Sequence, residues 1–187
     1  MPKSIPSVPD DETDILKRIE QNSQNAKAYY DLGYLLAQNP ARASEAETAY
    51  RQAIAFEPNN AQYIYRLGLL LHDHLHRFGE TEIAYRRSVE LAPENPFYYG
   101  GLISLLVQQS RRSEALVLSI KMRALLNTRE QWYGLATLDA ILGNADAAFE
   151  SLGKATCANK IDREWARNDP DLASIRDDPR FDEIVGR

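Results

Sequence analysis

The chain has 187 residues, a formal net charge of −5, and 44% hydrophobic and 26% charged residues. This length predicts one domain with a substantial core. The mild acidity argues against a nucleic-acid partner, because phosphates require clustered positive charge. The single cysteine, Cys157, excludes an intrachain disulfide. No apolar run is long enough for a signal peptide or a membrane span, so we expect a cytoplasmic protein that does not bind membranes.

The N-terminal 25 residues contain two different segments. Residues 1–9 hold three prolines and two serines, which predicts a disordered tail. Residues 10–25 have the pattern of a short amphipathic helix, with Ile15, Ile19 and Leu16 turned inward. We expect this helix to cap the exposed edge of the segment that follows.

The central part of the sequence repeats itself at an offset of 35 residues. The stretch "AYRQAIAFEPNN" (49–60) matches "AYRRSVELAPEN" (84–95), and "YYDLGYLL" (29–36) matches "IYRLGLLL" (64–71). The pattern continues downstream with weaker identity. We therefore expect four repeats, at 26–60, 61–95, 96–128 and 129–162.

Each repeat is expected to form two helices joined by a turn. Asn39–Pro40 is typical of a helix start, with Asn as the N-cap and Pro in the first turn. Pro58 and Pro93 follow the second helices, which a proline cannot continue. Gly33 and Gly68 stand one repeat apart and are predicted to lie where two helices approach closely.

The repeat resembles the tetratricopeptide repeat (TPR) family over about residues 26–160. The resemblance rests on aromatic–x–x–Leu–Gly in the first helix, small and aromatic residues in the second, and then Pro. It is weakest in the third repeat, where Ile103 occupies the small-residue position. The family implies an all-α TPR-type α-solenoid, a right-handed superhelix of antiparallel helix pairs with a concave groove.

Residues 163–187 are similar to the "DP…LRDDPRF" endings that follow TPR arrays in many bacterial proteins. Asp169–Pro170 and Asp178–Pro179 each combine an N-cap residue with a proline suited to the first helical turn. We expect this segment to be a C-terminal cap that covers the last repeat. Its apolar side chains available for packing are Trp165, Leu172, Ile175, Phe181, Ile184 and Val185.

The resemblance implies that function lies on the groove side of the first helices, and the helical period then supplies the residues. The groove candidates are Lys27, Tyr30, Tyr34, Gln62, Tyr65, Leu69, His72, Phe97 and Tyr133. This aromatic, weakly charged face is typical of a peptide-binding surface. Each aromatic side chain could instead pack against a neighbouring repeat. Tyr30 and Tyr34 occupy two places where the clamp for chaperone C-terminal carboxylates uses Lys and Asn, so we reject that variant.

All three histidines fall within residues 72–76. If the helix persisted, His72 and His76 would lie one turn apart and could bind zinc, but a specific site needs a third or fourth ligand. A polar turn between helices is therefore the preferred interpretation, with no metal and no cofactor. No phosphate-binding loop or nucleophile–base pattern is present.

The leading hypothesis is a non-enzymatic adaptor that binds a peptide or helix of another protein. The alternatives are a self-associating module that forms homo-oligomers and, less favoured, a metal-dependent site at His72 and His76.

Overall fold

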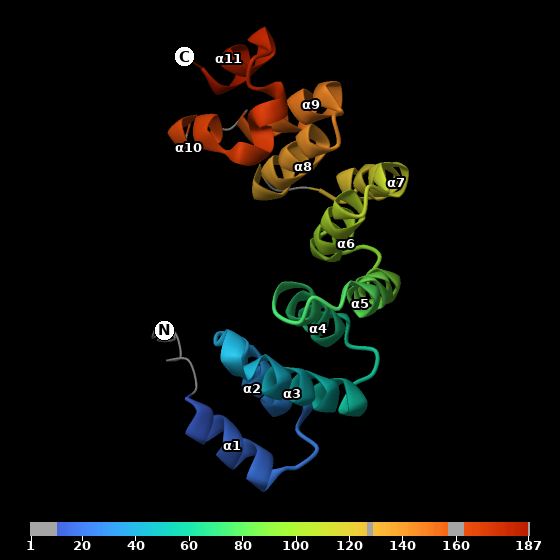
Figure 1. Cartoon of the computed structure of the whole chain (residues 1–187), viewed down its shortest axis with the longest axis vertical. Coiled ribbons are helices and arrows are strands. Elements are labelled where there is room, and N and C mark those ends of the chain that lie inside the picture. Colours follow the sequence, from blue (N-terminus) through green and yellow to red (C-terminus); the bar gives the residue numbers. More distant parts are fainter. Residues whose placement is uncertain (1–10, 127–128, 157–162, 187) are drawn as a thin grey trace, which may run out of the picture. The chain divides into compact units, whose positions relative to one another are not determined.

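The computed structural model describes residues 11–126, 129–156 and 163–186, and these residues form α-helices and short 3-10 turns without strands (Figure 1). The chain divides into two compact units, Met1–Ala92 and Pro93–Arg187. Residues 1–9, the repeat ends at 127–128 and 157–162, and Cys157 lie outside the described residues. None of the described helices is long and apolar enough to cross a membrane.

Unit 1 contains one helix followed by two helix pairs. The helices are α1 (Glu12–Gln21), α2 (Ala26–Leu36), α3 (Ala43–Phe56), α4 (Ala61–Asp73) and α5 (Phe78–Leu91). A 3-10 turn, η1 (Pro40–Arg42), precedes α3, and its N-cap is Asn39, which accepts a hydrogen bond from the amide of Ala41. The expected helix start at Asn39–Pro40 is confirmed.

The two pairs of unit 1 begin in the same way. Asn25 accepts a hydrogen bond from the amide of Ala28 and so caps α2. Asn60, one repeat later, accepts from the amides of Gln62 and Tyr63 and caps α4. A side-chain oxygen at this position satisfies amides that have no partner within the helix. The 35-residue period therefore sets where each first helix begins.

Glycine lets the two helices of each pair approach closely. A Cβ added to Gly33 would lie 2.7 Å from the ring of Tyr50, and one added to Gly68 would lie 2.7 Å from the ring of Tyr85. Both tyrosines are 2% exposed. The predicted close contacts at Gly33 and Gly68 are confirmed, and they establish the repeat register.

Helix α1 packs onto α2 as an additional second helix. Asp11 caps it by accepting from the amide of Asp14. Ile15 is 2% exposed, as expected, and Ile19 is half-buried. The expectation that Leu16 turns inward is wrong, because this side chain is 42% exposed. Leu16 immediately follows the buried Ile15, so the helical turn carries it toward solvent.

Unit 2 contains two helix pairs and a C-terminal segment. The pairs are α6 (Phe97–Gln108) with α7 (Arg112–Arg123), and α8 (Arg129–Ile141) with α9 (Ala145–Thr156). Gly143, at a φ of 77°, lies in the turn between α8 and α9. Ile103 is fully buried at the position where the first two repeats have glycine.

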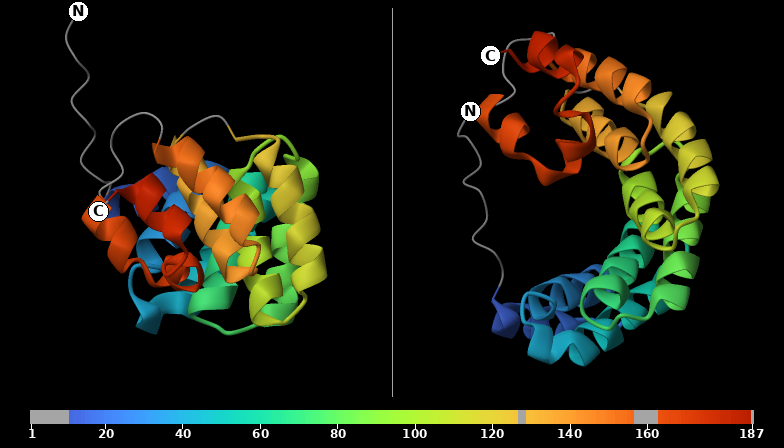
Figure 2. Two further views of the ribbon diagram at one scale, coloured as in Figure 1. Left: turned by 90° about the horizontal axis from the view of Figure 1, so that it is seen from above. Right: turned by 45° about the horizontal axis from the view of Figure 1, so that its top comes forward.

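The C-terminal segment consists of α10 (Arg163–Asn168), the 3-10 helix η2 (Pro170–Ile175) and α11 (Pro179–Val185). It packs on the last helix pair, with η2 against α8 and α11 against α9 (red in Figure 2). Asp169 and Asp178 act as the N-caps of η2 and α11, as the sequence predicts. The buried side chains are Leu172, Ile175, Phe181 and Val185. Trp165 packs with one side on the ring of Tyr133 and remains 55% exposed.

Candidate functional site

The candidate site in unit 1 is a surface of α2 and α4, formed by Lys27, Tyr30 and Tyr34 of α2 and by Gln62, Arg66, Leu69 and His72 of α4. We call this surface the first-helix face. Cross-helix contacts join its two helices: Gln62 of α4 donates a hydrogen bond of 3.1 Å to the hydroxyl of Tyr30 in α2. Its partly or fully exposed side chains are Lys27, Tyr34, Gln62, Arg66, Leu69 and His72. The face therefore combines an aromatic ring, an aliphatic side chain and several polar groups.

Two of the predicted groove tyrosines belong to the core. Tyr30 is 7% exposed and stacks on Tyr63 with ring centres 4.8 Å apart. Tyr65 is 6% exposed and lies 5.2 Å from the ring of Tyr85. The alternative that these aromatic side chains pack between helices therefore holds for Tyr30 and Tyr65. The helical period gives the side of the helix correctly but not what the neighbouring helix places over it.

Tyr34 is the large aromatic side chain that the first-helix face exposes. It is 45% exposed, and the guanidinium of Arg66 lies over its ring at 5.1 Å from the centre. A cation on the face of an aromatic ring is attracted by the ring's quadrupole. The contact joins α2 to α4, so Tyr34 and Arg66 form one composite surface. Sequence reasoning found Tyr34 but missed Arg66, and no periodic signal marks it, because Asp31 occupies the position one repeat earlier.

The remaining polar groups of the face are paired within unit 1. Lys27 binds Asp31 and lies over the ring of Tyr30. Arg18 of α1 binds the other carboxylate oxygen of Asp31 at 3.1 Å. Asp31 is therefore held by two cations.

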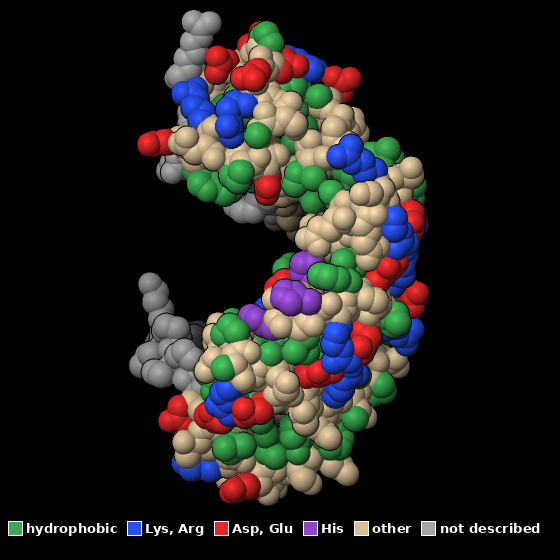
Figure 3. Space-filling view, viewed as in Figure 1, with side chains coloured by type: hydrophobic (Ala, Val, Ile, Leu, Met, Phe, Trp, Pro, Cys, Tyr) green, Lys and Arg blue, Asp and Glu red, His purple; other side chains and the backbone are tan. Residues whose placement is uncertain are grey.

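The histidines lie together at the end of α4 (purple in Figure 3). His72 belongs to the last turn of α4, whereas His76 stands in the following turn at a φ of 52°. Nδ1 of His72 lies 2.7 Å from a carboxylate oxygen of Asp73. The imidazole rings of His72 and His76 both lie beside the ring of Phe78. The helix ends before His76, so the two imidazoles do not share a helical face. Among the described residues, no group of three or more potential ligands is close enough to hold a metal ion.

In unit 2, the chain itself covers the corresponding side of α8. Tyr133 is 9% exposed, and its hydroxyl donates a hydrogen bond of 2.8 Å to Asp169. The ring of Trp165 lies 4.8 Å from that of Tyr133, and Ser174 donates to the carbonyl of Ala140. Tyr133 is therefore a contact of the C-terminal segment. Phe97, at the start of α6, is 57% exposed.

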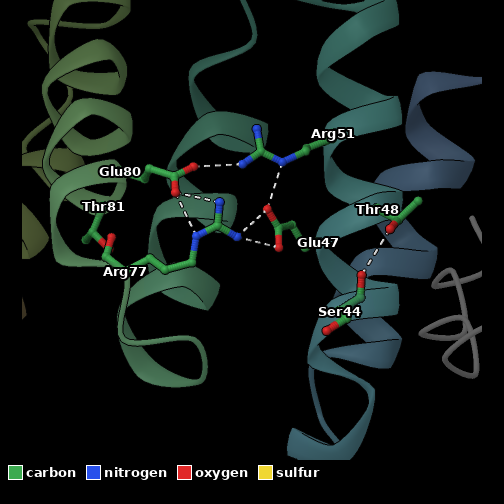
Figure 4. A network of polar contacts seen from close by, with 7 residues as sticks. All are labelled: Ser44, Glu47, Thr48, Arg51, Arg77, Glu80 and Thr81. Carbon is green, nitrogen blue, oxygen red and sulfur yellow. Dashed lines mark hydrogen bonds and ion pairs between the residues drawn. The ribbon is translucent and has the colours of Figure 1, made fainter.

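The helices α1, α3 and α5 of unit 1 are joined by a polar contact that occurs twice. Arg77 binds Glu47 of α3 and Glu80 of α5, and Arg51 binds the same two carboxylates (Figure 4). One repeat earlier, Arg42 binds Glu12 of α1 and Glu45 of α3. Sequence reasoning missed this contact, although the 35-residue offset relates Arg42 to Arg77 and Glu12 to Glu47.

An apolar groove of about 500 Å³ lies between α3 and α5. The side chains of Leu67 and Leu71 line it together with Ile54 and Ile83. Ile83, at its edge, is 70% exposed.

Comparison with known proteins identifies the fold. No family model and no curated protein matches the chain. Among solved structures, YrrB, a TPR protein with an unusual peptide-binding site, shares 18% identity at a TM-score of 0.64, over 95% of this chain and 93% of that one. PilF of Pseudomonas aeruginosa shares 18% identity at a TM-score of 0.67, and the match covers 82% of this chain and 69% of that one. PilW, a type IV pilus biogenesis factor, shares 16% identity at a TM-score of 0.65, and the match covers 88% of this chain and 73% of that one. The chain has the all-α fold of these TPR-type structures.

Proposed function

We propose that this chain is a non-enzymatic adaptor whose first-helix face in unit 1 binds a peptide or helical segment of another protein. The observation that carries the proposal is Tyr34, a 45%-exposed ring that joins α2 to α4 through Arg66. A rigid aromatic side chain supplies a large contact area at a low cost in conformational entropy. Leu69 and His72, both half-buried, extend this surface along α4.

A comparison of the first helices in the two units supports the choice of unit 1. In unit 2, the C-terminal segment lies on α8 and contacts Tyr133 through Trp165 and Asp169. In unit 1, no described segment packs over Tyr34, whose ring remains open to solvent. YrrB, which shares the fold, has a peptide-binding site. These findings favour the face of α2 and α4 as the place where a partner segment binds.

The test is to recover partners from the native lysate and to titrate each with purified variants. Tyr34→Ala should weaken binding by more than about 1 kcal/mol if the ring is an anchor. Its melting temperature should stay close to that of the parent, because the ring is already open to solvent. Ile83→Ala, which removes a 70%-exposed side chain from α5, is the matched control and should bind normally.

Two outcomes would redirect the proposal. Unchanged affinity in Tyr34→Ala, with loss of binding in Ile83→Ala, would move the binding surface to the groove between α3 and α5. A molecular mass that rises with protein concentration, and that Tyr34→Ala abolishes, would show that the partner is a second copy of this chain.

A further inference from the structure

Arg66 differs from the other arginines of unit 1 in its electrostatic partners. All seven arginines of this unit lie in the described residues 11–92, and six of them bind a carboxylate. The six ion pairs are Arg18–Asp31, Arg42–Glu12, Arg51–Glu47, Arg77–Glu80, Arg86–Glu82 and Arg87–Glu90. Within the described part of the chain, Arg66 has no carboxylate partner, and its contact is the ring of Tyr34.

The position of Arg66 leaves its hydrogen-bonding capacity available. Its guanidinium carbon lies 5.1 Å from the centre of the Tyr34 ring, and among the described residues none of its N–H groups donates a hydrogen bond. A guanidinium carries five N–H donors in a planar fork. Those donors match the two oxygens of a carboxylate, which arginine binds with two parallel hydrogen bonds. Because Arg66 is half-buried and supported by Tyr34, its side chain loses less freedom when it binds an anion.

The charge around Tyr34 is positive on a chain that is acidic as a whole. Lys27 and Arg66 lie on the first-helix face, and Arg18 adjoins it from α1. The carboxylate among them, Asp31, is already bound by Lys27 and Arg18. The net charge of the chain is −5. An acidic segment would therefore be attracted to this face and repelled by much of the remaining surface.

We infer that the segment bound by the first-helix face is acidic and carries an Asp or Glu near an apolar side chain. The carboxylate pairs with the N–H donors of Arg66, and the apolar side chain lies on Tyr34 and Leu69. This inference rests on the proposed function and adds the chemical class of the partner. The C-terminal segment presents the same combination to α8, with Trp165 on the ring of Tyr133 and the Asp169 carboxylate on its hydroxyl.

The test uses two synthetic libraries of labelled twelve-residue peptides that differ at one position. Both libraries fix a Leu or Trp, and four residues later one fixes Glu and the other Gln. Fluorescence anisotropy with the full chain should show that the Glu library binds at least about tenfold more tightly. The preference should weaken as salt is raised, because partly exposed charge pairs are screened.

Variants of Arg66 separate a contact with the ligand from a structural role. Arg66→Gln should abolish the preference for Glu, and Arg66→Lys, which keeps the charge but not the planar fork, should retain part of it. Arg66→Glu should reverse the preference toward a third library that fixes Lys. Arg87→Gln, which removes an arginine paired with Glu90 on α5, is the control and should bind as the parent does. Melting temperatures identify any variant that is not folded.

The inference is overturned if the parent binds the Glu and Gln libraries equally, if it binds neither, or if Arg66→Gln keeps the preference. The proposed function is judged separately, by the loss of partner binding in Tyr34→Ala. Loss of the partner in Tyr34→Ala with no effect of Arg66→Gln would retain the adaptor and reject the acidic ligand. No effect of either change would reject both.

Discussion

Tyr85 fills the space that a side chain at position 68 would need, with its ring 2.7 Å from the place where a Cβ of Gly68 would stand. The same relation joins Gly33 to Tyr50 one repeat earlier. Both rings are nearly inaccessible to solvent, so neither can swing away without opening the core. The distance between α2 and α3, and between α4 and α5, therefore depends on the absence of a side chain.

Gly68→Ala should destabilise unit 1 by about 1–3 kcal/mol, because the added methyl group overpacks the contact with Tyr85. Thermal unfolding followed by circular dichroism measures the effect. Gly79→Ala is the control, since a Cβ at position 79 meets nothing within 4 Å. A Gly68→Ala protein as stable as the parent would mean that the two helices can separate at no cost.

Arg77→Gln should lower the melting temperature at neutral pH, because one guanidinium binds Glu47 and Glu80 from two helices. The hydrogen bond from Arg77, aided by Arg51, holds the pKa of Glu80 below its usual value of 4.5. A carboxyl whose pKa is lower in the folded state stabilises the protein above its unfolded pKa, and this stabilisation is lost as the pH falls. The difference between parent and variant should therefore shrink as the pH falls below the usual pKa of a glutamate. A difference that does not change with pH would contradict this explanation.

Arg123→Ala should destabilise unit 2 by about 3–5 kcal/mol, because it leaves the buried carboxylate of Asp139 without its cation. The two side chains are 2.6 Å apart, with Asp139 fully buried. Burial raises the pKa of Asp139 more than Arg123 lowers it. A raised pKa in the folded state favours folding at low pH, so the defect of Arg123→Ala should diminish as the solution is acidified. Chemical denaturation at neutral and acidic pH gives the comparison.

The matched control for this pair is the double variant Arg123→Met with Asp139→Leu. Replacing both charges by apolar groups removes the unpaired carboxylate and should recover most of the lost stability. A double variant as unstable as Arg123→Ala would show that shape, rather than charge, decides the contact between α7 and α8.

Tyr133→Phe should loosen the C-terminal segment from α8, because it removes the hydrogen bond to the N-cap residue Asp169. The loss should be about 1–3 kcal/mol if it leaves the carboxylate of Asp169 unsatisfied on that side. Hydrogen exchange would detect faster exchange of backbone amides in η2. In Tyr99→Phe, whose hydroxyl binds the carbonyl of Pro93, exchange in η2 should be unchanged. Equal exchange in both variants would show that the hydrogen bond between Tyr133 and Asp169 does not hold the segment.

Simultaneous His72→Ala and His76→Ala should leave the response of the melting temperature to a chelator unchanged. Because α4 ends before His76, the two imidazoles are not one turn apart on a helix, and among the described residues no third ligand lies close enough to complete a site. A fall in the parent's melting temperature upon chelation, absent from the double variant, would establish a metal site.

N-caps and close contacts that recur in the repeat could be predicted from the sequence more reliably than the exposure of a side chain, which depends on the adjacent helix. The N-caps at Asn39, Asp169 and Asp178 follow from a side chain and the backbone beside it. Gly33 and Gly68 could be placed because the repeat offset aligns two independent examples of one contact.

Exposure on the first-helix face could not be predicted in the same way. Tyr30 and Tyr34 lie one helical turn apart, yet the first is buried under Tyr63 and the second is open to solvent. The difference arises from the neighbouring helix, which a helical period does not describe. Arg66 was missed for the same reason, since only the positions of its neighbours show that no carboxylate in the described part of the chain pairs with it.

Glu12 of α1 binds Arg42 in the same way as Glu47 of α3 binds Arg77 one repeat later. Helix α1 therefore provides the glutamate of this polar contact, as the second helix of a repeat does. In unit 1, Arg42 binds the glutamate of α1, and Glu47 of the same repeat binds Arg77 of the next one. Duplication of residues 26–60 within a gene would therefore insert a copy that carries both the arginine and the glutamate of these ion pairs. Unit 1 could therefore gain one repeat while the polar contact between α1, α3 and α5 keeps its form.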